Sequence, residues 1–212
     1  NRERYLTKVI ERRVEENTAC YIEFASGSFE VDEKMGNNPE EIGRIKENLI
    51  SLMQNERFDL DSIVVTSSAS PEGTIRFNER LSQKRSEGIS EYFSRWMNHY
   101  QDSLERERGF AVDEEGNIII QKRTQIPMLG RSSGENWRML DHLVEKDTLM
   151  TEDEKKGYIS SADIKDIDQR ERFLQSLDCY RHMREKLYPR LRTVRFDFHL
   201  HRKGMVKDTV HT

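Results

Sequence analysis

The chain has 212 residues, of which 34% are hydrophobic and 35% charged, which is enough for one domain with elaborations or for two small domains. Its net charge of −4 at pH 7 gives no overall attraction to nucleic acid, so we expect no nucleic-acid partner. The sequence contains no run of about 20 apolar residues, which excludes a membrane-spanning helix within this chain.

Strand patterns occur at four places. Residues 19–25 (ACYIEFA) alternate apolar and polar side chains, and residues 62–67 (SIVVTS) form a continuous apolar run. These patterns are typical of half-buried and fully buried strands. Residues 117–122 (NIIIQK) predict a third strand, and residues 193–202 (TVRFDFHLHR) alternate most clearly of the four.

Two helices are predicted between the first three strands. Asn38 is a favourable cap and Pro39 suits a first helical position, so we expect a helix over 39–53. A second helix is expected over 77–97, after the second strand. The apolar positions expected to face a common core are Ile42, Ile45, Leu49, Leu52, Leu81, Ile89, Phe93 and Trp96.

A long helical section, about 98–190, precedes the last strand. One helix in it opens with a capping box formed by Thr151 and Glu154, and the longest predicted helix covers 166–188, ending before Pro189. The order of elements predicts an α/β (α+β) sandwich, a small mixed sheet with helices mostly on one face. We expect residues 135–187 of this section to form a helical layer packed on the same core rather than an independent domain.

The cysteines and the chain ends complete the predicted organisation. Cys20 and Cys179 are the only cysteines, and we expect both to be buried free thiols, since two distant cysteines make neither a disulfide framework nor a zinc site. Residues 1–18 are interpreted as an N-terminal extension or edge strand, and residues 203–212 as the start of a connector to a further part of the protein.

The best candidate for a binding site is the loop after the second strand together with the helix that follows it. Pro71 and Gly73 are typical turn residues. The free N–H groups of a helix start favour anions, and Arg85, two turns into the helix, can lean back toward the loop. Asn78 can hydrogen-bond the loop backbone and hold its shape. Such a fork of donors suits a ligand carboxylate.

The stretch GTIRFNERLSQKRS resembles the signature of the OmpA-like peptidoglycan-binding domain. The resemblance covers about residues 19–97 and the final strand, whereas the section 98–190 matches poorly and is treated as a large helical insertion within an OmpA-like domain over 19–202. The positions that fall in register with the family pattern are Gly73, Asn78, Leu81, Ser82 and Arg85.

The resemblance implies a β-α-β-α-β-β fold and non-covalent, non-enzymatic binding of the peptidoglycan stem peptide. It implies a cell-envelope location, at the periplasmic face of the outer membrane of a Gram-negative cell, with no cofactor. In such domains an Asp meets the ammonium of diaminopimelate and an Arg meets its carboxylate. Arg85 matches the family Arg, whereas Ser70 stands at the position of the Asp.

The missing carboxylate changes what this loop can bind. Losing one charge-assisted hydrogen bond costs about 1.5–3 kcal/mol, or roughly ten- to a hundredfold in affinity. Glu72 in the same loop is a possible replacement. The predicted ligand-binding residues are therefore Ser68, Ser70, Glu72, Gly73, Asn78 and Arg85, with no catalytic residue and no metal ligand.

Other interpretations of the same residues remain open. Asn78 can serve only to hold the loop, and Arg85 can form a structural ion pair with Glu72. The sequence has no G-x-S-x-G elbow, P-loop or H-E-x-x-H motif, so we do not expect an enzyme. The main alternative is a protein–protein interaction module that keeps the OmpA-like fold, has lost peptidoglycan binding, and uses the insertion to bind an envelope protein.

Overall fold

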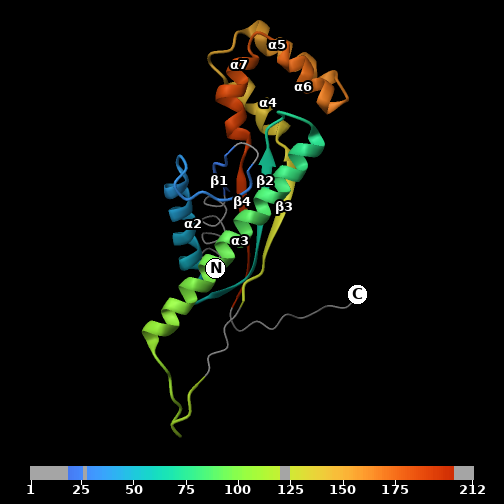
Figure 1. Ribbon diagram of the computed structural model, residues 1–212. Helices are drawn as coiled ribbons and strands as arrows, with labels where there is room; N and C mark the ends of the chain where they lie inside the picture. The colour runs from blue at the N-terminus through green and yellow to red at the C-terminus, as the bar shows by residue number, and fades with distance from the viewer. Residues whose placement is uncertain (1–18, 26–27, 120–124, 203–212) are drawn as a thin grey trace, which may run out of the picture.

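The computed structural model describes residues 19–25, 28–119 and 125–202, and it has a mixed α/β architecture built on a four-stranded sheet (Figure 1). The strand order is β1-β4-β2-β3. The central pair β2 and β4 is antiparallel, β3 runs parallel to β2, and β1 is antiparallel to β4. The predicted mixed sheet is therefore confirmed. The strands are β1 (Ala19–Cys20), β2 (Phe58–Ala69), β3 (Met128–Glu135) and β4 (Val194–Arg202).

Three of the four predicted strands join this sheet, and the third does not. The prediction of a sheet strand over 117–122 is wrong for its described part: Ile118 forms only an isolated bridge with Val112 in a protruding hairpin. Residues 120–122 lie outside the described residues. The third strand of the sheet is instead β3, about ten residues later, whose sequence MLGRSSGE has neither an apolar run nor β-branched side chains.

β3 has small residues at positions 130 and 132 because a helix backbone lies directly against that part of the strand. A Cβ atom on Gly130 would fall 2.6 Å from the backbone nitrogen of Glu87 and 2.7 Å from the carbonyl carbon of Ser86. Only glycine permits so close an approach of strand and helix. Ser132, two residues along the same face of β3, hydrogen-bonds Ser82 of that helix.

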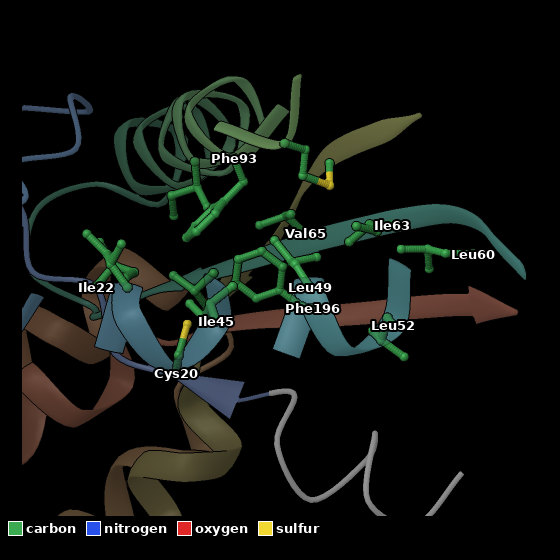
Figure 2. Close-up of a cluster of buried hydrophobic side chains, with 14 residues drawn as sticks. Cys20, Ile22, Ile45, Leu49, Leu52, Leu60, Ile63, Val65, Phe93 and Phe196 are labelled. Carbon is green, nitrogen blue, oxygen red and sulfur yellow. The ribbon is translucent and has the colours of Figure 1, made fainter. Parts of the chain in front are cut away.

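Helices α2 (Asn38–Met53) and α3 (Ile75–Arg108) pack on one face of the sheet, as predicted. Figure 2 shows Phe93 of α3 and Ile45 and Leu49 of α2 directed toward Val65 and Phe196 of the two central strands. The inward face of α3 is polar from its start to Ser86, however. Leu81 is only half-buried, and the buried positions there are Asn78, Ser82 and Ser86.

The section between β3 and β4 forms a helical unit, residues 137–191, at the end of the sheet where β2 ends and β4 begins (Figure 1). It has its own buried core rather than forming the predicted layer on the sheet. Its segments are α4 (Trp137–Lys146), α5 (Glu152–Ser160), a 3₁₀ turn (Ser161–Asp163), α6 (Ile167–Gln175), α7 (Tyr180–His182), a π-helical turn (Met183–Leu187) and a 3₁₀ turn (Tyr188–Leu191).

The single helix predicted over 166–188 is divided in two. Helix α6 ends at Gln175, and a turn that bonds Leu177 N–H to the Leu174 carbonyl and Tyr180 N–H to the Leu177 carbonyl precedes the next helical segment. Folding the chain back at this turn lets both segments bury side chains in one core. Cys179 in the turn is buried.

The remaining predictions on this scale concern the capping box, the thiols and the membrane. The capping box of Thr151 and Glu154 is present at the start of α5. Both cysteines are free and buried, and burial raises the pKa of Cys20 to about 12. Among the described residues, no helix is both long and apolar enough to cross a bilayer. The predicted extension at 1–18 and connector at 203–212 lie outside the described residues.

A buried carboxylate lies at the centre of the helical unit. Glu171 is 2% exposed, and its two oxygens accept hydrogen bonds from the hydroxyls of Tyr180 (2.9 Å) and Tyr188 (2.7 Å). Burial raises the pKa of Glu171, although these hydrogen bonds oppose the shift. The folded protein therefore binds a proton at Glu171 over a pH range in which the unfolded chain has released it.

This difference predicts a pH-dependent contribution to stability. The contribution is complete below the unfolded pKa of a glutamate and is lost as the pH rises through the raised pKa of Glu171, because the folded state binds more protons in this range. We expect Glu171→Gln to flatten the decline of unfolding free energy above about pH 4.3, the ordinary glutamate value. Urea unfolding between pH 4 and pH 8 measures it. The exposed Glu145→Gln is the control, and an unchanged slope in Glu171→Gln would contradict the assignment.

Candidate functional site

The loop between β2 and α3 is fixed at its helical end by residues of the helical unit. Gly73 has φ +89°, a conformation that favours glycine, and the Thr74 hydroxyl caps α3 by accepting from Phe77 N–H. The backbone N–H of Ile75 donates to Asp168 Oδ1 at 2.9 Å. A side chain of α6 therefore occupies part of the helix start at which the sequence predicts an anion.

Asn78 connects α3 to the end of β3 and not to the loop. Its amide donates to Glu135 Oε1 at 2.7 Å, and the other oxygen of Glu135 accepts from Trp137 Nε1 at 2.8 Å. Burial raises the pKa of Glu135 despite these two hydrogen bonds. Asn78 thus has a positioning role in the structure, joining the sheet, α3 and the first residue of α4.

The rest of the loop is bound to the segment that enters β4. Arg192 donates through Nε to Ser70 Oγ (3.1 Å) and through Nη2 to Glu72 Oε2 (2.6 Å). Arg184 lies 3.7 Å from the other oxygen of Glu72. Glu72 therefore pairs with Arg192. The ion pair between Arg85 and Glu72 that the sequence left open as an alternative is not formed.

Ser68, two residues before Ser70, also joins the end of β2 to the segment that enters β4. Its hydroxyl donates to the carbonyl oxygen of Leu191 at 2.6 Å and accepts from the backbone N–H of Thr193 at 3.0 Å. The end of β2 and the start of β4 are thereby held together on the side of the helical unit.

A cleft of about 530 Å³ opens beside this junction. Its walls come from the segment after β1, the turn before α2, the end of β2, α3, and the junction of the helical unit with β4. The residues that line it are Tyr21, Ile22, Glu23, Phe24, Met35, Gly36, Ser67, Ser68, Arg85, Pro189, Arg190, Arg192, Thr193 and Val194.

Arg85 is the most strongly perturbed charge in this cleft. Its guanidinium lies 4.9 Å from the centroid of the Phe24 ring, and its Nε donates to the carbonyl oxygen of Ser28 at 3.1 Å. Burial, and after it the charge of Arg192, lowers the pKa of Arg85 to about 10. The side chain remains cationic at neutral pH, and an anion placed near both guanidinium groups would offset their repulsion.

Ser67 is a polar residue in the wall of the same cleft. Its side chain is 2% exposed, and its Oγ has no hydrogen-bond partner among the residues that the structure describes. Buried hydroxyls are normally hydrogen-bonded, so an orphan of this kind requires an explanation. Ser67 is a wall residue of the cleft, but its Oγ itself has almost no surface that a water-sized atom in the cleft can touch.

The structure brings together only part of the predicted site. Ser68 and Arg85 line the cleft, whereas Ser70 and Glu72 stand behind it and position Arg192. The other two predicted residues, Gly73 and Asn78, shape the loop and the helix start. The cleft residues with polar or charged side chains that sequence reasoning missed are Tyr21, Glu23, Ser67, Arg190, Arg192 and Thr193.

One of these residues carried a signal in the sequence. Ser67 continues the alternation of Ile63 and Val65 on the core face of β2, so a polar residue at that position indicates a change from core to cavity. Arg192 and Glu23 had no such signal, because a long loop or a whole helical unit separates them from Arg85 in sequence.

The charges around the cleft favour an anionic group on the ligand. In the described part of the chain, three arginines line it, Arg85, Arg190 and Arg192, against the single carboxylate of Glu23. Glu72 neutralises part of the charge of Arg192 from outside. Comparison of the chain with protein-family models gave no match, and comparison with curated proteins gave none at the significance required.

Proposed function

We propose that this cleft binds a carboxylate group of the peptidoglycan stem peptide, in a non-enzymatic binding domain of the cell envelope. The observation that carries the proposal is the presence of the Arg85 guanidinium in the wall of a cleft that Arg190 and Arg192 also line. Guanidinium groups bind carboxylates through two parallel hydrogen bonds.

The sequence resemblance supports the same ligand class. The arginine that matches the family pattern is the one that lines the cleft, although 34 residues of α3 offer several other arginines. The pattern residues Asn78 and Ser82 are buried and hydrogen-bonded to the strand beside α3. Such contacts would hold α3, and with it Arg85, in a fixed position against the sheet. An OmpA-like topology is part of this proposal.

The alternative is an interaction module that has lost peptidoglycan binding and recognises an envelope protein. One observation favours it: the loop acid that could replace the family Asp, Glu72, is already paired with Arg192 and Arg184. The two functions separate experimentally, because only the first requires Arg85 for sedimentation with insoluble peptidoglycan.

We expect Arg85→Ala to weaken binding of a soluble diaminopimelate-containing stem peptide by about ten- to a hundredfold, since charge-assisted hydrogen bonds contribute about 1.5–3 kcal/mol. Isothermal titration calorimetry measures the affinity, and co-sedimentation tests the intact polymer. Arg95→Ala is the matched control, because Arg95 lies on the same helix and pairs with Glu91 at the surface.

The outcomes discriminate between the two functions. A folded Arg85→Ala protein, verified by circular dichroism, that binds the peptide as well as Arg95→Ala does would contradict the role of Arg85. A wild-type protein that neither sediments with peptidoglycan nor binds the peptide would favour the interaction module.

A further inference from the structure

Among the residues that the structure describes, Glu23 is the single acidic side chain in the wall of the cleft, and neighbouring residues hold it in position. Its backbone N–H donates to Asn38 Oδ1 at 2.7 Å, and its carbonyl oxygen accepts from Asn38 Nδ2 at 2.9 Å. Asn38 is 0% exposed and also donates to the carbonyl of Asp32 at 2.8 Å. Asn38, which the sequence suggested as a helix cap, therefore holds the main chain on both sides of the Glu23 Cα. The residue at the cap position of α2 is Asn37, whose side chain makes no capping hydrogen bond.

The Glu23 carboxylate occupies space that a glycine leaves free. A Cβ atom on Gly36 would lie 1.4 Å from Glu23 Oε2, so any side chain at position 36 would displace the carboxylate. Gly36 also has φ +48°, which favours glycine. The backbone N–H of Asn37 donates to the same oxygen at 3.2 Å.

We infer that Glu23 is a specificity-determining residue that binds a cationic group of the ligand, while Arg85 binds its carboxylate. The two charges lie in the wall of one cleft, which makes the cleft complementary to a zwitterion, such as the amino-acid end of a peptide side chain. This inference rests on the proposed function, because it assigns the second charge of the same ligand.

The assignment of the cation to Glu23 follows from what the other carboxylates do. Glu72 accepts from Arg192, and Glu135 accepts from Asn78 and Trp137, so both have partners away from the cleft. Glu23 accepts one long hydrogen bond through Oε2, and a carboxylate has about four acceptor positions. It therefore retains the capacity to accept from an ammonium group.

A pair of probes that differ only in ammonium groups tests the inference: meso-diaminopimelate and pimelate, which has the same carbon chain and carboxylates without amino groups. NMR titration of the full chain measures both affinities. We expect the wild type to prefer diaminopimelate by about three- to tenfold, because Glu23 is exposed and solvent screens the charge pair. Glu23→Gln should abolish this preference while pimelate binds as before.

Gly36→Ala provides a second test that leaves the charge of the protein unchanged. Displacing the Glu23 carboxylate should reduce the preference for diaminopimelate as Glu23→Gln does. Two controls accompany it: Gly43→Ala, where a Cβ meets nothing within 4 Å, and Glu40→Gln, which removes an exposed acid of α2 that does not line the cleft. Circular dichroism verifies that each variant is folded.

The results separate this inference from the proposed function. If Arg85 is required for both probes and Glu23→Gln keeps the wild-type preference, the Glu23 inference is wrong and the carboxylate site stands. If the wild type binds neither probe and no stem peptide, both are overturned. Loss of the preference in Glu23→Gln and Gly36→Ala, with both controls unchanged, supports the assignment.

Discussion

Replacement of Phe93 by alanine is expected to lower the free energy of unfolding by about 3–5 kcal/mol, the range typical of a buried Phe-to-Ala substitution. Phe93 is 1% exposed, and its ring meets those of Phe196 and Tyr92 edge-to-face at centroid distances of 5.4 and 5.0 Å. The substitution removes an aromatic contact between α3 and the central strands, and α3 carries Arg85.

Phe77 provides a matched control, since it is a phenylalanine on the same helix with 55% of its surface exposed. Phe77→Ala should change stability by less than about 1 kcal/mol, as exposed substitutions usually do. Urea unfolding followed by circular dichroism measures both variants, and a loss of 3–5 kcal/mol corresponds to a drop of about 6–20 °C in Tm. Equal effects of the two substitutions would show that α3 is not held by this core.

The central part of the fold could be predicted because its residues follow simple periodicities. The alternation of residues 193–202 and the apolar run at 62–67 correspond to β4 and to the middle of β2. The stripe of Ile42, Ile45 and Leu49 packs where its spacing indicates. At these positions burial alone determines the residue type, so the pattern is visible in a single sequence.

β3 could not be predicted, because close packing determines its composition. Gly130 and Ser132 are small so that the backbone of α3 can approach, and such residues give a loop signal in a sequence. The apolar run at 118–119 gave the opposite error: it predicted a buried strand of the sheet, whereas Ile118 and Ile119 are exposed in the hairpin. A run of isoleucines indicates a strand only where another layer covers it.

The candidate site was predictable on one side only. Arg85 follows from a local motif, whereas Arg192 and Pro189 reach the cleft from the far end of the helical unit. The pairing of Arg192 with Glu72 and of Ser68 with Thr193 fixes that end against the loop. The helical unit, although it has a separate core, therefore supplies one wall of the cleft, and this relation is invisible without tertiary structure.

Asn38 joins the stability of the fold to the inferred specificity of the cleft, and Asn38→Ala tests both at once. The substitution removes three hydrogen bonds of a side chain that is 0% exposed, two of them to the backbone of Glu23. At about 0.5–1.5 kcal/mol for each bond, we expect a loss of about 2–4 kcal/mol in the free energy of unfolding.

The neighbouring Asn37→Ala is the control: Asn37 is exposed, it occupies the N-cap position of α2 without a side-chain capping hydrogen bond, and it donates to Glu23 through its backbone N–H, which alanine retains. Its stability should stay within about 0.5 kcal/mol of the wild type. Asn38→Ala should also reduce the preference for diaminopimelate over pimelate, since the main chain of Glu23 loses its two side-chain contacts. If Asn38→Ala is as stable as Asn37→Ala, the three hydrogen bonds of the Asn38 side chain contribute nothing to the stability of the fold. If stability falls but the ligand preference is kept, Asn38 supports the fold without positioning Glu23.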